Sequence, residues 1–392
     1  MRKQILILIL VVFCLMFVFA CSSDDDDNDN DNDSVDDDDD DDDNDNDDDN
    51  DNDDNDDDND DDEYFPFQEM FDSILNRLVS EFWNESGNWE SDMMHDATSF
   101  APEVLFGYGN EIDDASLIDK GNKTCLWELD LISQVFSGDP SAIYPTAMGA
   151  MSIMWGYFYD VDPAFTIYYH LARTLGNPIV SQFYQQLADV LDVFPAACYL
   201  GLMAHVNHQI ARHETGYLRD RAIEWGVALV EIAYADCWDS ETGLFQGTED
   251  NHGELTSSGV MLIAVSESAF MTGDPVMLER AENLIAAMNE HLWDPVRGGY
   301  WDGVEPRGKF LSTESMALRG VVALYEATAN PIYRQKAEDV LAWIEQDLYF
   351  EGLCYHDWTE EDGRSPNFCT GCNFVLLDAI FTLHTIGLIE DR

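Results

Sequence analysis

The sequence predicts an all-α domain between residues 63 and 392, in which six helical hairpins close into a ring, the (α/α)6 toroid. Apolar residues recur every three or four positions here, without the two-residue alternation of strands, which predicts helices. A short phrase also repeats between the helices: an aromatic, usually an acid or amide, a glycine and a second aromatic. It occurs as FWNESGNW (82–89), CWDSETGLF (237–245), WDPVRGGYWDGV (293–304) and YFEGLCYHDW (349–358). Such self-similarity predicts a repeat architecture.

The first 20 residues have the pattern of an export signal. A basic Met1-Arg2-Lys3 precedes an apolar run from Ile5 to Phe19, which is short for a membrane span. The run ends in VFAC, which resembles the lipobox of bacterial lipoproteins, so Cys21 is predicted to be the lipidated first residue of the mature chain. An ordinary signal peptide or an uncleaved anchor is the alternative. By the same resemblance, Ser22 favours the outer membrane or cell surface of a Gram-negative bacterium.

Residues 21–62 are predicted to be a disordered acidic linker. From residue 24 onward the segment holds 28 Asp and 9 Asn, interrupted only by Ser34 and Val35. It offers no apolar surface to bury. Specific calcium sites are the alternative, although the turn glycine and terminal glutamate of calcium loops are missing. The net charge of the whole chain is −62, and the part after the linker keeps −36 of it. This charge excludes nucleic acid as a partner and favours neutral over anionic glycans.

The domain from 63 to 392 is expected to contain twelve helices. At four places a proline follows a glycine or asparagine by one or two residues, which indicates a helix end and the start of a new helix: Gly138-Asp139-Pro140, Gly176-Asn177-Pro178, Gly273-Asp274-Pro275 and Asn330-Pro331. The expected helices span 65–83, 94–109, 115–137, 145–159, 165–190, 194–213, 217–236, 256–272, 275–292, 312–328, 331–348 and 369–386.

Alternate helices differ in composition. Those near 217, 275 and 331 carry mixed charge and align on Ala222, Ala281 and Ala337, which predicts an outer, amphipathic layer. Those near 256, 312 and 369 are apolar nearly all round, which predicts an inner, buried layer. Outer and inner helices in six pairs are what a closed ring of hairpins requires.

Three segments carry a resemblance to a known superfamily: GGYWD (298–302), TGDPVMLERAENLI (272–285) and TESMALRGVVALYEATANPIYRQKAEDVLAW (313–343). The domain resembles the six-hairpin glycosidase superfamily. It is similar to its α-1,6-mannanase, unsaturated glucuronyl hydrolase and N-acylglucosamine 2-epimerase families. The mannanase family carries adjacent aspartates on an inner helix, whereas the Asp113-Asp114 pair here falls in a turn between helices. That catalytic pair is therefore not transferred.

The resemblance implies a carbohydrate-active enzyme, with a glycoside hydrolase acting on neutral glycans as the first expectation. A sugar epimerase or isomerase is the alternative within enzymes, and a non-catalytic glycan-binding or structural lipoprotein is the alternative outside them. The partners expected are a carbohydrate substrate and, through the lipid anchor, a membrane. The chain is expected to be a monomer.

Loops that lead from outer to inner helices gather at one mouth of such a ring, and this nominates the site residues. Glycoside cleavage uses two carboxyl groups, one protonated and one ionised. The candidate carboxyls are Asp96, Glu254, Glu314 and Asp357. Capping or first-turn roles are the alternatives for Asp96 and Glu314. If Glu314 is functional, its place at a helix start is expected to keep it ionised.

Aromatic side chains in the same loops could stack on sugar rings or pack against neighbouring repeats. The candidate substrate-binding residues are Trp89, Tyr300, Trp301, His356 and Trp358, with Trp301 and Trp358 expected to be exposed. His205 and His208 stand three apart on one inner helix. They are expected to be satisfied buried histidines rather than metal ligands, because two ligands do not make a site.

Cys354, His356, Cys369 and Cys372 form the sharpest local cluster. A disulfide from Cys354 to Cys369 or Cys372 is the first expectation in an exported protein, because it would hold the loop before the last helix. A structural zinc bound by all four residues and a redox-active CxxC pair are the alternatives. No other metal or cofactor is expected.

Overall fold

The computed structural model describes residues 67–91, 100–135, 143–191, 195–248, 253–305 and 307–390. Residues Phe65–Arg392 form a unit separate from Met1–Tyr64. The predicted signal peptide, Cys21 and the acidic linker lie outside the described residues, as does Asp96.

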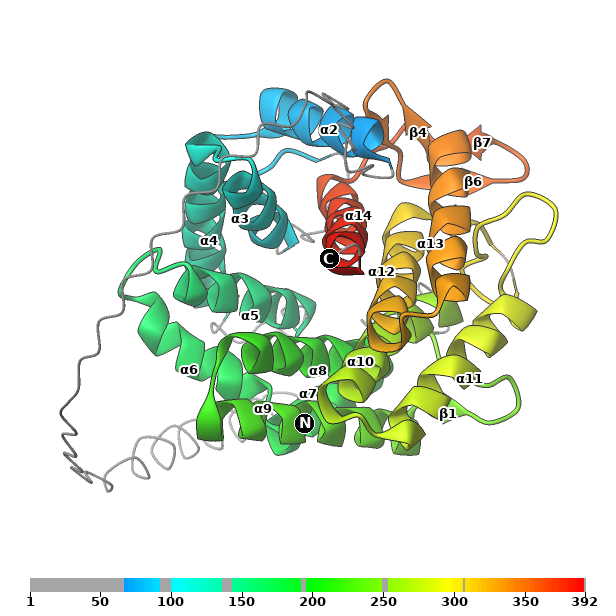
Figure 1. The fold of residues 1–392 in the computed structure, drawn as a ribbon, viewed down its shortest axis with the longest axis horizontal. Helices are drawn as coiled ribbons and strands as arrows, with labels where there is room; N and C mark the ends of the chain where they lie inside the picture. The colour runs from blue at the N-terminus through cyan, green and yellow to red at the C-terminus, as the bar shows by residue number, and fades with distance from the viewer. Residues whose placement is uncertain are drawn as a thin grey trace, which may run out of the picture. The chain divides into compact units, whose positions relative to one another are not determined.

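Paired helices form the predicted (α/α)6 toroid (Figure 1). The inner helices contact one another in a closed circle: α3 (Ala101–Glu111), α5 (Ile143–Phe158), α8 (Ala196–His213), α10 (Glu254–Thr272), α12 (Leu311–Thr328) and α14 (Thr370–Glu390). The helices outside them are α2 (Gln68–Arg77), α4 (Ala115–Val135), α6 (Phe165–Leu175), α7 (Pro178–Leu191), α9 (Gly216–Asp236), α11 (Pro275–His291) and α13 (Pro331–Trp343).

Burial confirms the predicted division into layers. The outer helices α9, α11 and α13 bury one stripe each, and the aligned alanines Ala222, Ala281 and Ala337 lie in it. The inner helices α10 and α12 are buried on nearly every side. Helix α10 is also long and apolar enough to cross a membrane, but 78% of that stretch is buried inside the structure, as an inner helix of a ring requires.

The first and last hairpins close the ring through contacts between distant parts of the chain. Helix α14 contacts α3, and the Thr370 hydroxyl donates to the carbonyl of Glu90. Arg77 on α2 donates to the carbonyl of Glu351 in the loop before α14. The described chain therefore completes its ring without a second copy.

Apart from shifts of several residues at helix ends, the helices differ from prediction in one break and in the form of two last turns. The segment expected as one helix over 165–190 is two helices, because Asn177 accepts the amide of Ile179 and starts α7 at Pro178. The last turns of two outer helices, Leu78–Phe82 and Ile344–Leu348, are π-helical. Short strands also form in the loops, where the sequence predicted none: β1 (Trp238–Asp239), β2 (Leu244–Phe245), β3 (Lys309–Phe310), β4 (Tyr349–Phe350), β5 (Leu353–Cys354), β6 (Asp357–Thr359) and β7 (Gly363–Arg364).

Three of the four occurrences of the repeated phrase form the same turn, whereas in the fourth Tyr349 pairs with Cys354. In these three, the acid or amide accepts the amide two residues later, with Asn84 bonded to Ser86, Asp239 to Glu241 and Asp294 to Val296. A glycine with positive φ then reverses the chain, at Gly87, Gly243 and Gly298 respectively. The two aromatics pair across the turn, as in Trp83–Trp89, Trp238–Phe245 and Trp293–Tyr300.

Candidate active site

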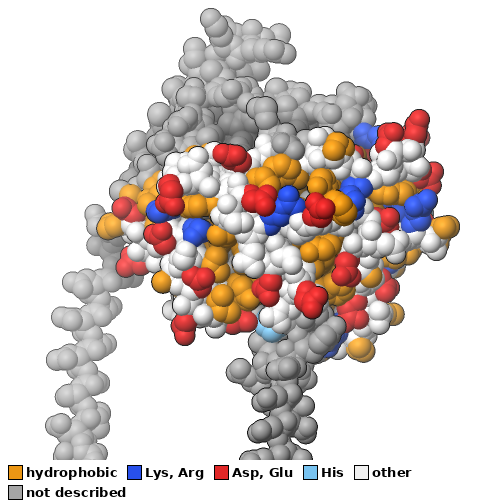
Figure 2. Space-filling model, turned by 90° about the horizontal axis from the view of Figure 1, so that it is seen from above, with side chains coloured by type: hydrophobic (Ala, Val, Ile, Leu, Met, Phe, Trp, Pro, Cys, Tyr) orange, Lys and Arg blue, Asp and Glu red, His pale blue; other side chains and the backbone are white. Residues whose placement is uncertain are grey.

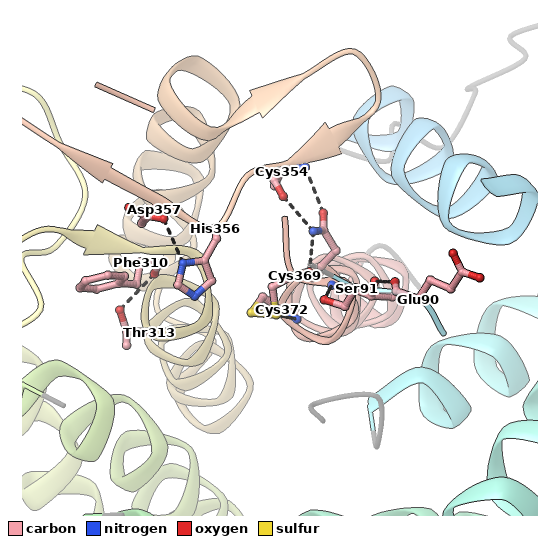
Figure 3. The surroundings of a disulfide bond; sticks show 11 residues. Glu90, Ser91, Phe310, Thr313, Cys354, His356, Asp357, Cys369 and Cys372 are labelled. Carbon is pink, nitrogen blue, oxygen red and sulfur yellow. Dashed lines mark hydrogen bonds and ion pairs between the residues drawn. A yellow bond between two sulfur atoms is a disulfide. The ribbon is translucent and has the colours of Figure 1, made fainter. Parts of the chain in front are cut away.

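The mouth of the ring is the face where the inner helices begin. The loop before α14 contains β6, which pairs with β3 just ahead of α12. In this pair Phe310 of β3 lies opposite Asp357 of β6. We call the group formed by Phe310, Thr313, His356, Asp357 and the Cys369–Cys372 disulfide the mouth cluster. Figure 3 shows His356 lying between Phe310 and Thr313 on one side and the disulfide at the start of α14 on the other.

His356 and Asp357 form the ionisable pair of this cluster. The Nδ1 atom of His356 lies 3.0 Å from a carboxylate oxygen of Asp357. The two side chains are 12% and 25% exposed, so both still reach solvent. The backbone fixes them, since the amide of Leu311 donates to the carbonyl of His356 over 2.8 Å. A histidine held against a carboxylate is suited to proton transfer.

The other candidate carboxyls have different surroundings. Glu254 begins α10, is partly buried, and accepts the amide of Val304 over 3.1 Å. Glu314 is fully buried in the first turn of α12 and accepts the amide of Tyr300. Burial raises the pKa of Glu314 to about 8, although the Tyr300 amide and the charges of Lys309 and Lys336 oppose this shift. The expectation that the helix start keeps Glu314 ionised is therefore wrong, because loss of solvent outweighs the helix end.

Most of the aromatic candidates are buried. Trp89 and Trp358 are each 4% exposed and Tyr300 is 0% exposed, which leaves no ring face for a sugar. Trp89 donates to the hydroxyl of Thr124, and Tyr300 donates to Asn289. The prediction that these three rings bind substrate is wrong, and so is the expected exposure of Trp358, because neighbouring side chains cover the rings, such as Phe374 on Trp89 and Trp301 on Trp358. Trp301 and His356 are only partly buried.

The cysteines pair differently from the prediction. Cys369 is bonded to Cys372, and Cys354 is a buried free thiol. An amide does the work expected of the disulfide: Asn373 donates to the carbonyls of Cys354 and Cys369 and accepts the amide of Cys354 over 3.0 Å. Two hydrogen bonds from this buried side chain thus hold Cys354 of the loop to α14, and the third stays at the start of the helix. The other free cysteines among the described residues, Cys125, Cys198 and Cys237, are also buried.

The alternative of a structural zinc does not fit these residues. Two of the four ligands it would need, Cys369 and Cys372, are bonded to each other. Zinc is bound by thiolates, so the sulfur atoms of this disulfide do not serve as ligands. In the described parts of the chain, no three His, Cys, Asp or Glu side chains are grouped to hold a metal ion.

A second group of ionisable residues lies among the inner helices, and we call its members His205, His208, Glu267, Arg319 and Asp378 the axial cluster. Both histidines of α8 face Glu267 of α10, with Nδ1 of His205 2.9 Å and Nδ1 of His208 3.4 Å from its carboxylate. Burial raises the pKa of Glu267, but the two histidines outweigh it and hold the pKa well below its usual range. The two histidines are buried, as predicted, but they are not fully satisfied, because Nδ1 of His208 and Nε2 of His205 make no hydrogen bond among the described residues.

Arg319 of α12 donates to Asp378 of α14 over 3.0 Å, and both are buried. Burial raises the pKa of Asp378, and the charge of Arg319 opposes it. The Nε2 atom of His205, the Nη1 atom of Arg319 and the Oδ1 atom of Asp378 have no hydrogen-bond partner among the described residues. Sequence reasoning missed Glu267, Arg319 and Asp378, although single charges inside apolar helices were a visible signal.

Searches by sequence find no relative, since no family model and no curated protein matches the chain. The solved structures do contain similar folds. An inactive variant of an α-1,6-mannanase from a Salegentibacter species, in complex with α-1,6-mannotetraose, has a TM-score of 0.56 and 14% identity, and the match covers 81% of this chain and 98% of that one.

Two sugar-converting enzymes match over a similar extent. Cellobiose 2-epimerase from Bacillus thermoamylovorans has a TM-score of 0.54 and 11% identity, covering 81% of this chain and 98% of the epimerase. A D-mannose isomerase has a TM-score of 0.54 and 10% identity, covering 82% and 98%. At these identities the likeness concerns the fold. The chain is thus similar in fold, over most of its length, to glycoside hydrolases and sugar epimerases built on the six-hairpin toroid.

Proposed function

We propose that this chain is a carbohydrate-active enzyme that acts on neutral glycans at the mouth of its ring, most simply as a glycoside hydrolase. The observation that carries the proposal is the partly exposed His356–Asp357 pair, held at the start of an inner helix. The fold supports it, because the mannanase that shares this fold is in complex with a neutral manno-oligosaccharide. The acidic side chains scattered over the face drawn in Figure 2 support a neutral substrate.

We assign Asp357 and Glu254 as the carboxyl pair. Both border the segment between Asp302 and Phe310, because Glu254 accepts the amide of Val304 and Asp357 pairs with Phe310. Glu314 is too deeply buried to meet a substrate and is left out. Glycosidic cleavage needs one carboxyl to donate a proton to the leaving oxygen and one to act as base or nucleophile.

The test measures hydrolysis of a panel of neutral oligosaccharides, including α-1,6-linked mannotetraose, by Asp357→Asn and Glu254→Gln variants. Loss of one acid–base group lowers kcat by about 100- to 10,000-fold. We expect a fall of this size in both variants, and we expect both to remain folded. Glu360→Gln is the matched control, since Glu360 is an exposed acid in the turn after β6. Full activity in the Asp357→Asn variant would remove this residue from the mechanism.

A sugar epimerase or isomerase is the second candidate, and the hydrogen bond between His356 and Asp357 favours it. Such a pair could remove and return a proton next to a carbonyl group. Proton NMR in deuterated water separates the candidates, because hydrolysis releases new reducing ends whereas epimerisation exchanges a carbon-bound hydrogen. Binding without either product would identify a glycan-binding protein.

We also propose that the enzyme is a monomer anchored by lipid at the outer membrane or cell surface of a Gram-negative bacterium. The proposal rests on the VFAC sequence that ends at Cys21 and on the acidic linker that follows. A Cys21→Ser variant is expected to leave the membrane fraction while the ring domain keeps its melting temperature. Fractionation of cells followed by immunoblotting checks this. A processed variant that stays with membranes would count against lipidation.

A further inference from the structure

Lys309 is a fully buried lysine, which is unusual for this residue type. It lies on β3, and its ammonium group donates to Asp294 Oδ2 over 2.8 Å and to the carbonyl of Gly298. Three tryptophan rings surround the same nitrogen, with centroids at 4.6 Å for Trp301, 4.9 Å for Trp343 and 5.4 Å for Trp358.

These contacts connect the repeated turn to β3, the strand that carries Phe310 of the mouth cluster. Asp294 and Gly298 belong to the turn after α11. Lys309 stands opposite Trp358 in the β3–β6 pair, and the next residues, Phe310 and Asp357, stand opposite each other. The side chain of Lys309 therefore holds the turn on one side and, on the other, contacts Trp358 of β6, the strand that begins at Asp357.

Packing alone does not require a charge at this place. Desolvating an ammonium group opposes folding, and an apolar side chain of similar volume would fill the same space among three indole rings. A hydrogen-bonded ion pair does fix one geometry, because its donors and acceptors have directions that apolar contacts lack.

We propose that Lys309 is a positioning residue for the mouth site: its link to Asp294 and Gly298 keeps β6 in register with β3, and so sets where Asp357 meets the substrate. The expected effect of Lys309 on turnover rests on the proposed function. Its expected effect on the β3–β6 pair rests on the structure alone.

The test compares Lys309→Met with Lys336→Met. Lys336 is the matched control, because it belongs to α13 and lies against Trp293 and Tyr300 of the same turn, 3.0 Å and 5.1 Å from their ring centroids. Hydrogen exchange reports the strand pair through the amide of Leu311, which bonds to the carbonyl of His356, and the loop beside it through the amide of His356, which bonds to the carbonyl of Asn367.

In Lys309→Met we expect these two amides to exchange about tenfold faster or more, while amides of the inner helices change less. We expect kcat to fall by about tenfold or more, with little change in KM. Lys309→Arg is expected to restore part of both. Lys336→Met is expected to change neither.

Faster exchange that is uniform over the whole ring, or equal in both methionine variants, would overturn the link to the strand pair. Faster exchange confined to the strand pair with unchanged kcat would overturn the positioning role. If the chain turns over no glycan at all, the proposed function fails while the exchange comparison still decides whether Lys309 holds the strands.

Discussion

A single carboxyl, Glu314, shows how burial decides a residue's part in the molecule. It stands in the first turn of α12, where a helix favours an acid, yet it is fully buried and its pKa is raised to about 8. Near neutral pH its protonated form predominates, and it anchors the amide of Tyr300 over the repeated turn.

The stability of the protein should therefore depend on pH through Glu314. Because its folded pKa is about 8 and its ordinary value is 4.5, its stabilising contribution is fully present below about pH 4.5 and is lost as the pH rises to about 8. Glutamine keeps the acceptor and cannot ionise. We expect Glu314→Gln to differ little near pH 5 and to be more stable by about 2–4 kcal/mol near pH 8. Urea unfolding at both pH values measures this, and parallel pH profiles would contradict it.

Sequence patterns predicted residue types near the mouth better than they predicted roles. The loop before α14 does supply His356 and Asp357, but Trp358 beside them is buried. A periodic pattern cannot separate an aromatic that packs in its repeat from one that faces a ligand. The predicted staple at Cys354 failed because Asn373 holds the loop by hydrogen bonds, and no spacing rule identifies such an amide.

At the scale of elements, the recurring turn sets how each outer helix passes to the mouth. In the turn of residues 294–299, both glycines have positive φ, 83° at Gly298 and 71° at Gly299. A Cβ atom on Gly299 would lie 2.5 Å from the ring of Trp343, which is itself buried. Position 299 therefore requires glycine for two reasons, its positive φ and the close approach of the Trp343 indole.

Two alanine substitutions separate these requirements. Gly273→Ala meets positive φ, 65°, with nothing within 4 Å of the new Cβ, so it measures conformational strain alone. We expect it to cost about 1 kcal/mol. Gly299→Ala adds the collision with Trp343, and we expect about 2–4 kcal/mol in total. Thermal and urea unfolding of both variants check the difference. Equal losses would mean that the indole moves aside freely.

The order and type of the helices could be read from the sequence because each has an apolar period and several have clear ends. Asn330 and Asp274 cap their helices just before prolines, at two of the predicted boundaries. Gly176-Asn177-Pro178 signalled the break, yet the apolar period that continues over 165–190 led to the prediction of one helix across it. The short strands could not be predicted, because two residues are too few for a period and their pairing depends on distant segments.

At the scale of the whole molecule, the ring brings together residues that no local pattern connects. The axial cluster draws on α8, α10, α12 and α14, and Arg319 and Asp378 are 59 residues apart in the chain. The toroid itself could be predicted, because six pairs of outer and inner helices match a closed ring of hairpins and three segments resemble a superfamily with that fold. Which charges meet inside it depends on the rotation of each helix about its axis, and the sequence does not specify that rotation.

The central claim is that a neutral glycan is bound at the mouth, beside His356 and Asp357. A crystal structure of the Asp357→Asn variant soaked with an α-1,6-linked mannotetraose, or with the best substrate of the panel, tests it most directly. The account predicts a sugar ring within hydrogen-bond distance of residue 357, against Phe310 and Thr313. An oligosaccharide bound elsewhere on the ring, or an empty mouth at a concentration that saturates binding in solution, would contradict it.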